Sequence, residues 1–379
     1  MSDMTRIAIA AGGTAGHINP ALALAEELKA RGHEVTFYGQ PSRLEGTLVP
    51  QAGFPFVPLD VTGFDRARPW TLATALVHMR RAQRAVAAHV ASAGAPDVAV
   101  GFGAYVELPL LRWCAAHDVP YLLHEQNSVP GLANKTMASK ASCVCVSLPV
   151  AIDAFRGHVG ASTQIVVTGN PVRRSVVDAS REEGRAHAGV TDGDVLLLVF
   201  GGSLGARHLN AGVCALKDEL LARPGLHILH STGAKDYDDV VRRLALSDDE
   251  AARWRVVPYI DAMGEALAAA DLVLSRAGAS SIAEIAALAV PSMLVPYPFA
   301  TADHQTTNAR YLVDAGAAVV LADERIDDPA FSQELLGLLD DPARRAAMRA
   351  AARALRQDRA AVALADQVES LQTPLARHA

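Results

Sequence analysis

The chain has 379 residues, of which 50% are hydrophobic and 20% are charged, and this composition is typical of a folded protein of two domains rather than a disordered one. The formal net charge of −6 argues against a surface dominated by nucleic-acid binding. The four cysteines form no CxxC pair, which favours buried thiols in a reducing compartment over a metal site. No apolar run approaches the ~18 residues of a membrane-spanning helix, so we expect a chain that is made and kept in the cytoplasm.

In chain order, short apolar runs alternate with longer helical patterns, which predicts βαβ units and mostly parallel sheets. The runs fall into two series, and each series predicts one doubly wound domain. Two Ala- and Arg-rich helices end the chain, and we expect the last one to pack on the first domain. The predicted strands are residues 7–11, 35–38, 98–101, 121–124, 143–146 and 164–168, and then 195–200, 227–231, 255–258, 272–275, 292–295 and 318–321.

A glycine motif occurs twice, as GGTAG at residues 12–16 and as GGSLG at residues 201–205. Each copy follows an apolar strand and opens a helix, so both predicted domains begin with the same device. Asn-Pro marks a turn within residues 169–175, where we expect the domains to join. The predicted domains are residues 1–168, joined by the C-terminal helix at 350–379, and residues 169–349.

Glycine loops of this kind permit positive φ angles, and the free amides of the helix that follows favour an anion. Thr14 and Ser203 add a hydroxyl group to each loop. A tight turn without a ligand is the alternative interpretation. Neither loop has the GxGxxG spacing, no acidic residue follows the second strand, and no GKS or GKT occurs. We therefore expect neither a nicotinamide or flavin cofactor nor a Walker A site.

His17 distinguishes the first loop, because the second has Ala206 at the equivalent position. A loop that only cradles phosphate does not need an imidazole. With an ordinary pKa of ~6.5, His17 is a candidate general base at neutral pH. A histidine that caps or packs against the helix is the alternative. Because ligands of parallel sheets bind outside the carboxyl ends of the strands, we expect the active site in a cleft between the domains.

Six motifs in order resemble those of the MurG family, the peripheral membrane N-acetylglucosaminyltransferases that convert lipid I to lipid II in peptidoglycan synthesis. The resemblance implies an α/β GT-B fold, with two Rossmann-like doubly wound parallel-sheet domains that face an interdomain cleft. It places the lipid acceptor in the first domain and UDP-GlcNAc in the second. Ala15 and Ala104 stand where the family has glycine, so we expect ordinary φ angles there. The motifs are GGTAGHINP, GFGAYVELP, HEQNSVPGLANK, GNPVR, GGSLGARHLN and the segment at 275–310.

The resemblance implies a set of donor-binding residues. Glu284 would hold the ribose hydroxyls, Ile260 would pack near uracil, and the serines at 280 and 281 would meet the diphosphate at a helix N-terminus. His304, Gln305 and Asn127 would read the GlcNAc hydroxyls. Each residue also has an alternative without a ligand. Glu284 would only favour the helix dipole, Ile260 would be a core residue, and the two serines would cap the helix. The polar loop side chains would be solvated, and Arg173, a candidate for the phosphates, would form an interdomain salt bridge. The full set is Thr14, Gly16, Asn127, Arg173, Ser203, Ile260, Gly278, Ala279, Ser280, Ser281, Glu284, His304 and Gln305.

The resemblance also implies the acceptor side and the chemistry. His17 would deprotonate the muramoyl 4-hydroxyl, which attacks the anomeric carbon opposite UDP and inverts it to a β-1,4 linkage. Glu125 is a second candidate catalytic residue that polarises or positions the acceptor. No adjacent DxD pair occurs, so we predict no metal site and expect helix N-termini, serine hydroxyls and Arg173 to meet the charge of the diphosphate. The predicted acceptor-binding residues are Gly13, Ala15, Gly103, Ala104 and Tyr105.

Residues 63–86 combine an apolar face with arginines, which suits an anionic membrane surface. An ordinary amphipathic helix with a solvated basic face is the alternative. We expect a peripheral protein on the cytoplasmic face of the cell membrane, which binds UDP-GlcNAc and undecaprenyl-pyrophosphoryl-MurNAc-pentapeptide (lipid I), meets other cell-wall synthesis or division proteins, and binds no nucleic acid. The predicted patch is Trp70, Leu72, Leu76, Met79, Arg80, Arg81 and Arg84, extended by Arg66, Arg68, Val77, Trp113, Lys135 and Lys140.

Two alternatives to the lipid I transferase remain open from the sequence. One is another GT-B enzyme that uses UDP-GlcNAc, such as the 2-epimerase, which needs no lipid surface. The other is a catalytically silent sugar-nucleotide-binding scaffold, against which the presence of His17, Glu125 and Glu284 argues.

Overall fold

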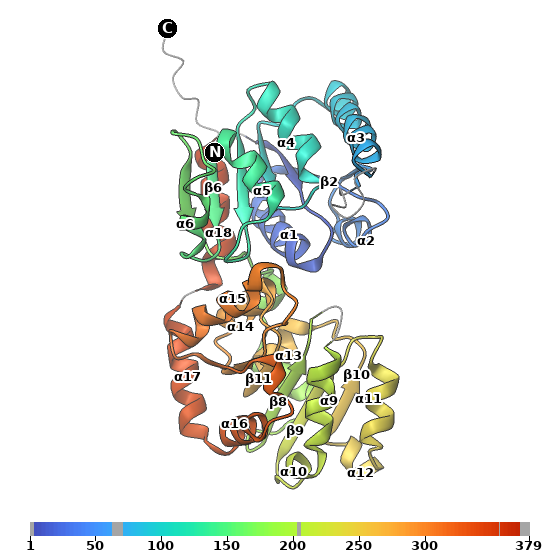
Figure 1. Ribbon diagram of the computed structural model, residues 1–379, viewed down its shortest axis with the longest axis vertical. Helices are drawn as coiled ribbons and strands as arrows, with labels where there is room; N and C mark the ends of the chain where they lie inside the picture. Colours follow the sequence, from blue (N-terminus) through green and yellow to red (C-terminus); the bar gives the residue numbers. More distant parts are fainter. Residues whose placement is uncertain (1–3, 63–70, 203–205, 356, 372–379) are drawn as a thin grey trace. The chain divides into compact units, whose positions relative to one another are not determined.

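The computed structural model describes residues 4–62, 71–202, 206–355 and 357–371 (Figure 1). The chain divides into two compact units. Unit 1 comprises Met1–Arg173 and Arg359–Ala379, and unit 2 comprises Arg174–Asp358.

Unit 1 contains a parallel sheet in which the described residues form seven strands in the order β3-β2-β1-β4-β5-β6-β7. Six of them lie within a residue or so of the predicted strands. The sequence analysis missed β3, an edge strand of three residues with a proline at its end, which is too short to show a period. The strands are β1 (Arg6–Ala10), β2 (Glu34–Gly39), β3 (Phe56–Pro58), β4 (Val98–Gly101), β5 (Tyr121–Glu125), β6 (Cys143–Val146) and β7 (Gln164–Val167).

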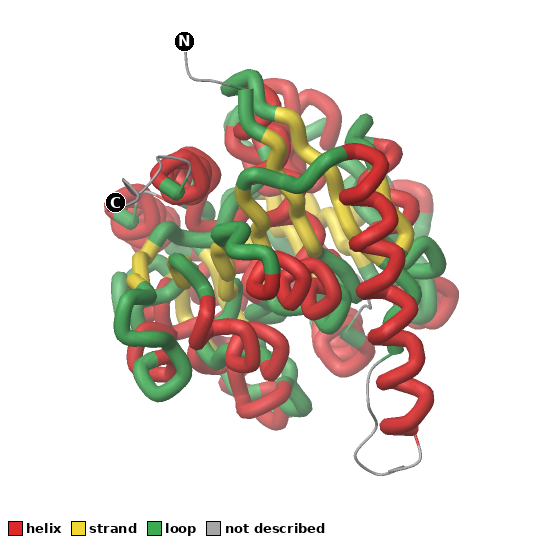
Figure 2. The backbone as a smooth tube through the Cα atoms, turned by 90° about the horizontal axis from the view of Figure 1, so that it is seen from above, coloured by secondary structure: helices red, strands yellow, loops and turns green. Residues whose placement is uncertain are grey.

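Helices cover both faces of this sheet, and the alternation of side chains along β1 decides which helices lie on which face. Ile7 and Ile9 belong to the core shared with α1, α2 and α18, whereas Ala8 and Ala10 belong to the core shared with α3, α4 and α5. Figure 2 shows strands flanked by helices. The helices of unit 1 are α1 (Ala15–Ala30), α2 (Glu45–Gln51), α3 (Thr71–Ala93), α4 (Glu107–Ala116), α5 (Leu132–Met137), η1 (Ala138–Lys140), α6 (Ala151–Phe155) and α18 (Ala360–Ser370).

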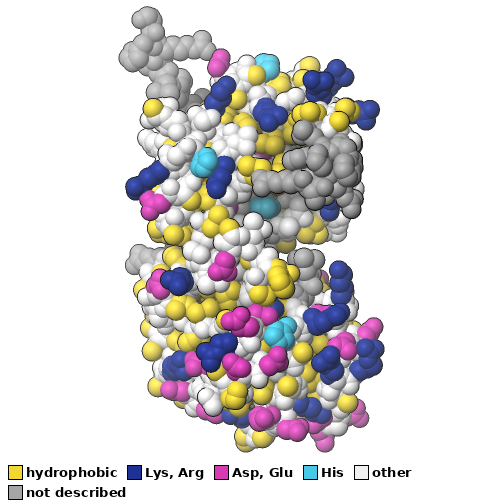
Figure 3. Space-filling model, in the orientation of Figure 1, with side chains coloured by type: hydrophobic (Ala, Val, Ile, Leu, Met, Phe, Trp, Pro, Cys, Tyr) yellow, Lys and Arg dark blue, Asp and Glu magenta, His cyan; other side chains and the backbone are white. Residues whose placement is uncertain are grey.

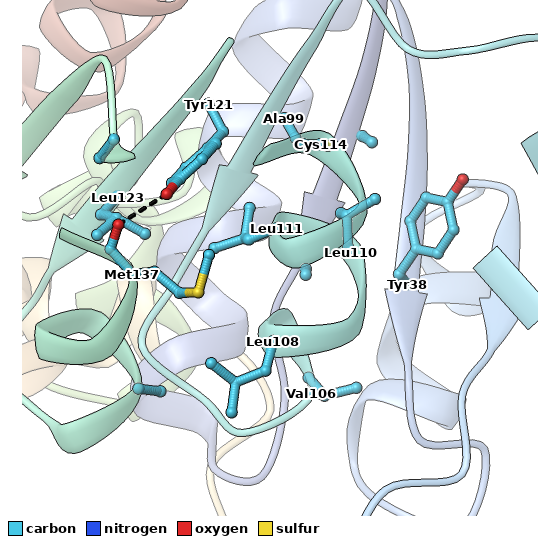
Figure 4. Close-up of a cluster of buried hydrophobic side chains, with 14 of the residues drawn as sticks. Tyr38, Ala99, Val106, Leu108, Leu110, Leu111, Cys114, Tyr121, Leu123 and Met137 are labelled. Carbon is cyan, nitrogen blue, oxygen red and sulfur yellow. Dashed lines mark hydrogen bonds between the residues drawn. The ribbon is translucent and has the colours of Figure 1, made fainter. Parts of the chain in front are cut away.

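The core between α4 and the sheet is drawn in Figure 4. Leu110, Leu111 and Cys114 of α4 are fully buried in it. The hydroxyl of Tyr121 donates a hydrogen bond of 2.7 Å to the carbonyl oxygen of Met137, so the one polar atom of this ring is satisfied. This packing fixes α4, which follows the loop after β4.

Unit 2 contains a second parallel sheet, with six strands among its described residues in the order β10-β9-β8-β11-β12-β13. The predicted pair of doubly wound parallel-sheet domains is therefore confirmed. The strands are β8 (Val195–Phe200), β9 (Leu226–Ser231), β10 (Trp254–Val257), β11 (Leu272–Ser275), β12 (Ser292–Leu294) and β13 (Ala318–Val320). The helices are α7 (Arg174–Val177), α8 (Arg181–Ala188), α9 (Arg207–Ala215), α10 (Lys217–Leu221), α11 (Tyr237–Leu244), α12 (Asp248–Ala251), α13 (Met263–Ala269), α14 (Ala279–Ala287), η2 (Thr301–Asp303), α15 (His304–Val313), η3 (Asp323–Arg325), α16 (Pro329–Asp340) and α17 (Pro342–Ala354), followed by η4 (Gln357–Arg359) at the boundary of the units.

Each sheet reverses its strand order once, between β1 and β4 in unit 1 and between β8 and β11 in unit 2. Ligands of open α/β sheets bind at this point, outside the carboxyl ends of the strands. In unit 1 the loops at residues 11–14 and 102–106 follow β1 and β4, and Ala10 pairs with Gly101 at the ends of those strands. The two glycine motifs assigned to the acceptor therefore lie side by side. Within the described residues, no helix has both the length and the apolar character to cross a bilayer.

Candidate active site

His17 lies in the first turn of α1, directly after the loop that follows β1. The helix begins at Ala15, and the residue before it, Thr14, is extended with φ −136° and ψ 157°. The Nδ1 atom of His17 lies 3.1 Å from the carbonyl oxygen of Gly12. A carbonyl can only accept, so this contact assigns the ring proton to Nδ1 and leaves the lone pair on Nε2.

Desolvation lowers the pKa of His17 below its ordinary value, and the charges of Glu125 and Glu45 and the contact with Gly12 partly offset this shift. The imidazole is therefore neutral at pH 7 and can accept a proton at Nε2. This state is the one that a general base requires.

Glu45 is a buried carboxylate beneath the first glycine loop, and the sequence analysis missed it. Its side chain accepts hydrogen bonds of 3.1 Å from the backbone amides of Gly13 and Gln40. A Cβ atom on Gly12 would lie 2.3 Å from Oε1 of Glu45, so any other residue there would displace the carboxylate that holds the loop. In the sequence, Glu45 has the pattern of an exposed residue at a helix start. Only the fold shows that it holds the loop.

The amide of Gly13 is thus used internally, at a φ angle of +86°. The amides of Ala15 and Gly16, in the first turn of α1, have no internal acceptor among the described residues. These two amides and the positive end of the helix dipole are available to an anion. The φ angle of Ala15 is not positive, and neither is that of Ala104, as expected for both.

The loop after β4 turns at Gly103, which has a φ angle of +83°. Its amide donates to Oε2 of Glu107 at 2.5 Å, and the amide of Glu107 donates to the carbonyl of Ala104 at 2.9 Å. Tyr105 stands between them with 41% of its surface exposed. The loop therefore presents Tyr105 outward, packs Ala104 partly against the core, and keeps the amide of Gly103 inward.

Glu125 ends β5 and is almost completely buried, with 2% of its surface exposed. Its Oε2 accepts from the amide of Gly131 at 3.0 Å and from Nδ2 of Asn134 at 2.9 Å, and its Oε1 accepts from the amide of Asn127 at 3.1 Å. Both oxygens therefore hold the segment that follows the strand. The roles predicted for Glu125, polarising or positioning the acceptor, stay predictions.

Five of the predicted donor residues of unit 2 lie on the first turns of α14 or at its N-cap, directly after β11. Gly278 is the N-cap, and the amides of residues 279–281 have no internal acceptor among the described residues. The Oγ atom of Ser280 is buried without a hydrogen-bond partner in the described chain. Glu284 lies one turn further along the same helix and is half-buried. This end of α14 can bind an anion through amides, a hydroxyl group and the helix dipole.

The loop between β12 and α15 is held through Gln305. Its Oε1 accepts hydrogen bonds from the amides of Ala277 and Tyr297, at 3.2 and 2.9 Å. These contacts leave its Nε2 group as the donor toward a ligand. His304 donates from Nδ1 to the carbonyl of Thr301 at 2.8 Å. The two residues therefore start α15 beside the loop that precedes α14.

Three predicted donor residues have other surroundings. Arg173 is paired with Glu26 of α1 at 3.0 Å, within unit 1. The side chain of Ile260 is buried in the core of unit 2, so any contact it makes with a base is through its backbone. Ser203 lies outside the described residues.

Arg276, directly after β11, was not singled out from the sequence. Its guanidinium donates to the carbonyls of Val295 and Pro296 at 3.1 Å and pairs with Asp323 at 2.5 Å. It also lies 5.9 Å from the ring centre of Tyr297. Arg276 therefore holds the start of the loop between β12 and α15, next to the predicted donor residues. Within the described residues, no group of three or more His, Cys, Asp and Glu side chains could hold a metal ion.

Part of the predicted membrane patch is exposed on α3. Leu76 and Val77 are 52% and 46% exposed, and Arg80, Arg81 and Arg84 are exposed on the same helix. Met79 is a partial correction, because it is half-buried and packs against the core of unit 1. Trp113 likewise packs against this core, and its ring stacks on His117 at 4.2 Å. Trp70, Arg66, Arg68 and the side chain of Leu72 lie outside the described residues.

The comparisons with known proteins agree with this geometry. Residues 7–146 match the N-terminal domain of glycosyltransferase family 28, and residues 196–367 match its C-terminal domain. A relative from Desulforudis audaxviator is 39% identical, and the match covers 97% of this chain and 98% of the relative. A relative from Nitratidesulfovibrio vulgaris (strain Hildenborough) is 40% identical, and the match covers 99% of this chain and 100% of the relative. Both are named UDP-N-acetylglucosamine–N-acetylmuramyl-(pentapeptide) pyrophosphoryl-undecaprenol N-acetylglucosamine transferase.

Among solved structures, MurG from Acinetobacter baumannii is similar, with a TM-score of 0.73 and 28% identity over 97% of this chain and 99% of that one. The resemblance inferred from the motifs is thereby confirmed over nearly the whole length. The chain belongs to glycosyltransferase family 28.

Proposed function

We propose that this protein transfers GlcNAc from UDP-GlcNAc to the 4-hydroxyl of the MurNAc residue of lipid I, with inversion, to give the β-1,4-linked lipid II of peptidoglycan synthesis. The observation that carries this proposal is the neutral imidazole of His17 in the first turn of α1. It lies next to the amides of Ala15 and Gly16, which have no internal acceptor among the described residues. A base and an anion site at one point suit an acceptor that has a hydroxyl group and a diphosphate. The relatives that match nearly the whole chain are named for this reaction.

In this mechanism, Nε2 of His17 takes the proton of the 4-hydroxyl as the oxygen attacks the anomeric carbon. The bond between that carbon and the phosphate oxygen breaks, and UDP leaves with the electron pair. Gly12 keeps the other ring proton on Nδ1, so the tautomer is set before substrate binds. The amides of Ala15 and Gly16 bind the acceptor's diphosphate at the start of α1. Gly16, which the resemblance assigns to the donor, is thus proposed here for the acceptor.

Unit 2 binds the donor. The amides of Ala279 to Ser281 and the hydroxyl group of Ser280 receive the diphosphate, on which negative charge grows as UDP leaves. Glu284 accepts hydrogen bonds from the ribose hydroxyls, and Nε2 of Gln305 donates to the sugar. Because hydrogen-bond donors of this kind are already in place, they stabilise the transition state without reorganisation of the site.

The acceptor's lipid requires that the protein meets a membrane, and we place that contact on α3 at the cytoplasmic face. Leu76 and Val77 are exposed apolar side chains beside Arg80, Arg81 and Arg84. Figure 3 shows basic and hydrophobic side chains together on the part of unit 1 where Figure 1 labels α3. Apolar side chains rimmed by arginine bind anionic bilayer surfaces by combining burial with charge attraction.

The test is incubation of the whole protein with radiolabelled UDP-GlcNAc and a lipid I analogue. We expect label in the acceptor and release of UDP that depends on the acceptor. Release of epimerised sugar or UDP without acceptor would replace the transferase with an epimerase. Binding of UDP-GlcNAc with no turnover, with or without the lipid I analogue, would favour the catalytically silent sugar-nucleotide-binding scaffold.

A further inference from the structure

Glu107 is a buried carboxyl group that the proposed mechanism does not use. It begins α4 and has 0% of its surface exposed. Its Oε2 accepts from the amide of Gly103, while its Oε1 is buried without a hydrogen-bond partner in the described chain. An ionised carboxylate in such a place would lose most of its hydration for a single hydrogen bond.

The surroundings of Glu107 do not supply a compensating charge. Burial, followed by the negative charge of Glu125, raises the pKa of Glu107 to about 8 even though the bond from Gly103 opposes the shift. Glu107 forms no ion pair with any described residue. The titratable side chains on the other elements that pack against α4 are His78, Arg80, Arg81, Arg84 and His89 on α3, Glu34 and Tyr38 on β2, Tyr121, His124 and Glu125 on β5, and Lys135 on α5, with none on β4. The three arginines of α3 are exposed.

The residue also closes the turn that carries the predicted acceptor residues. Its carboxyl group holds the amide of Gly103, and its own amide holds the carbonyl of Ala104. The side chain fills the space next to β4, since a Cβ atom on Gly101 would lie 2.7 Å from its Oε2. The shape of residues 103–105 therefore depends on one side chain that lies behind them.

We propose that Glu107 is a positioning residue for the acceptor's diphosphate, whose neutral carboxyl group holds the Gly103 turn in its binding shape and whose ionisation weakens acceptor binding. This inference rests on the proposed function. The physical reason is that a carboxylate behind the turn would repel a diphosphate in front of it across a single peptide unit, in a region with little water to screen the two charges. A neutral carboxyl group supplies the same hydrogen-bond acceptor without that repulsion.

The experiment measures KM for a soluble lipid I analogue, with UDP-GlcNAc saturating, between pH 6.5 and pH 9.5. For the unmodified protein we expect KM to rise above pH ~8, by up to about tenfold per pH unit, because one proton is linked to binding. Glu107→Gln keeps an acceptor oxygen for Gly103 and cannot ionise. Its KM should stay flat over the same range, with kcat and the KM for UDP-GlcNAc within about twofold of the unmodified protein.

Glu27→Gln is the matched control, because Glu27 is another buried glutamate of unit 1 but binds Arg31 at the far end of α1. It should follow the pH profile of the unmodified protein. Glu107→Leu removes the acceptor for Gly103 and should raise the acceptor KM at least tenfold at every pH.

A rise in KM for Glu107→Gln that parallels the unmodified protein would overturn the inference, as would a flat profile for the unmodified protein. Absence of any transfer by the unmodified protein would instead overturn the proposed function, and this inference with it. If the unmodified protein transfers GlcNAc but Glu107→Gln has the same pH profile of the acceptor KM, only this inference is overturned and the proposed function stands.

Discussion

At the scale of single residues, His17 carries the largest predicted effect. Replacing it with alanine removes the base but leaves unit 2 intact, so we expect kcat to fall by about 10²–10⁴ while UDP-GlcNAc binding is unchanged. The pKa of His17 is lowered, so kcat of the unmodified protein should hold down to below pH 6.5 and fall only as the imidazole gains a proton. Steady-state kinetics and calorimetric titration of UDP check both points.

A loss of less than about tenfold in His17→Ala would assign proton removal to another group. Thr14 belongs to the predicted donor-binding set, so only kcat is compared for its control variant. Thr14→Ala removes a hydroxyl group that lies 3.4 Å from Nδ1 of His17 and not on the side of the proposed proton transfer. It should change kcat far less than His17→Ala does.

The stability of the fold should also report the buried Glu107. Its pKa is about 8 in the folded chain against an ordinary 4.5, so between these values the folded chain binds more protons than the unfolded chain. The free energy of unfolding must then fall as pH rises from ~4.5 to ~8 and level off above that window. Glu107→Gln lacks this penalty, so its melting temperature relative to the unmodified protein should climb over the same window. Thermal unfolding at a series of pH values measures it, and a constant difference between the two proteins would contradict the assignment.

At the scale of elements, the exposed face of α3 predicts how the protein meets a membrane. Replacing Leu76, Val77 and Arg80 together with glutamine removes two apolar side chains and one positive charge. The charge alone contributes about 1 kcal/mol of binding free energy near an anionic surface, and the lost apolar burial adds to this. We expect at least a tenfold loss of co-sedimentation with anionic vesicles, while transfer to a soluble acceptor analogue is kept.

The matched control lies on α11 of unit 2, where Val241 and Arg242 are also an exposed apolar and basic pair. Replacing these two with glutamine should leave vesicle binding unchanged. Equal losses in both variants would show that binding does not depend on α3.

The C-terminal helix α18 is held against α1 by Arg31, whose guanidinium contacts Glu27, Asp366 and Glu369 at 2.7–2.9 Å. Arg31→Ala would leave three carboxylates without their shared partner. We expect a loss of about 1–3 kcal/mol in the free energy of unfolding, because hydrogen bonds to charged groups are the stronger ones. Denaturant titration measures it.

Arg156 is the matched control for Arg31, because its pair with Asp153 leaves both side chains more than 70% exposed. Arg156→Ala should change stability by less than about 0.5 kcal/mol, since water screens such pairs. A similar loss in the free energy of unfolding for both variants would show that the contact between Arg31 and α18 stabilises the fold no more than an exposed ion pair does.

At the scale of the whole molecule, the two units predict a separation of the two substrates. Glu284→Gln in unit 2 should raise the KM for UDP-GlcNAc at least tenfold and leave the acceptor KM within about twofold, because a neutral amide accepts less strongly from ribose hydroxyls than a carboxylate does. Variants at Gly103 or Tyr105 in unit 1 should show the opposite pattern. Initial-rate kinetics with each substrate varied in turn measure the split, and a shared change in both constants for Glu284→Gln would contradict the division.

The sequence by itself determined the alternation of strands and helices, the duplicated glycine loop and the position of His17. These features are local, because apolar periods, glycine turns and motif spacing lie within a few residues of one another. The family followed from motifs of the same local kind. Among the described strands, β3 was missed, because three residues cannot show a period.

The tertiary structure decided which side chains stand behind the loops. Glu45 is 32 residues from Gly13 in the sequence, and Glu107 has the pattern of an exposed helix start, yet both are fully buried beneath glycine turns. Met79 likewise has the pattern of an apolar surface residue, but in the structure it is half-buried and packs against the core of unit 1. Burial depends on what packs from the rest of the chain, which no local pattern contains. At Glu107, burial is what raises the pKa of the carboxyl group and makes it a neutral group that shapes the turn.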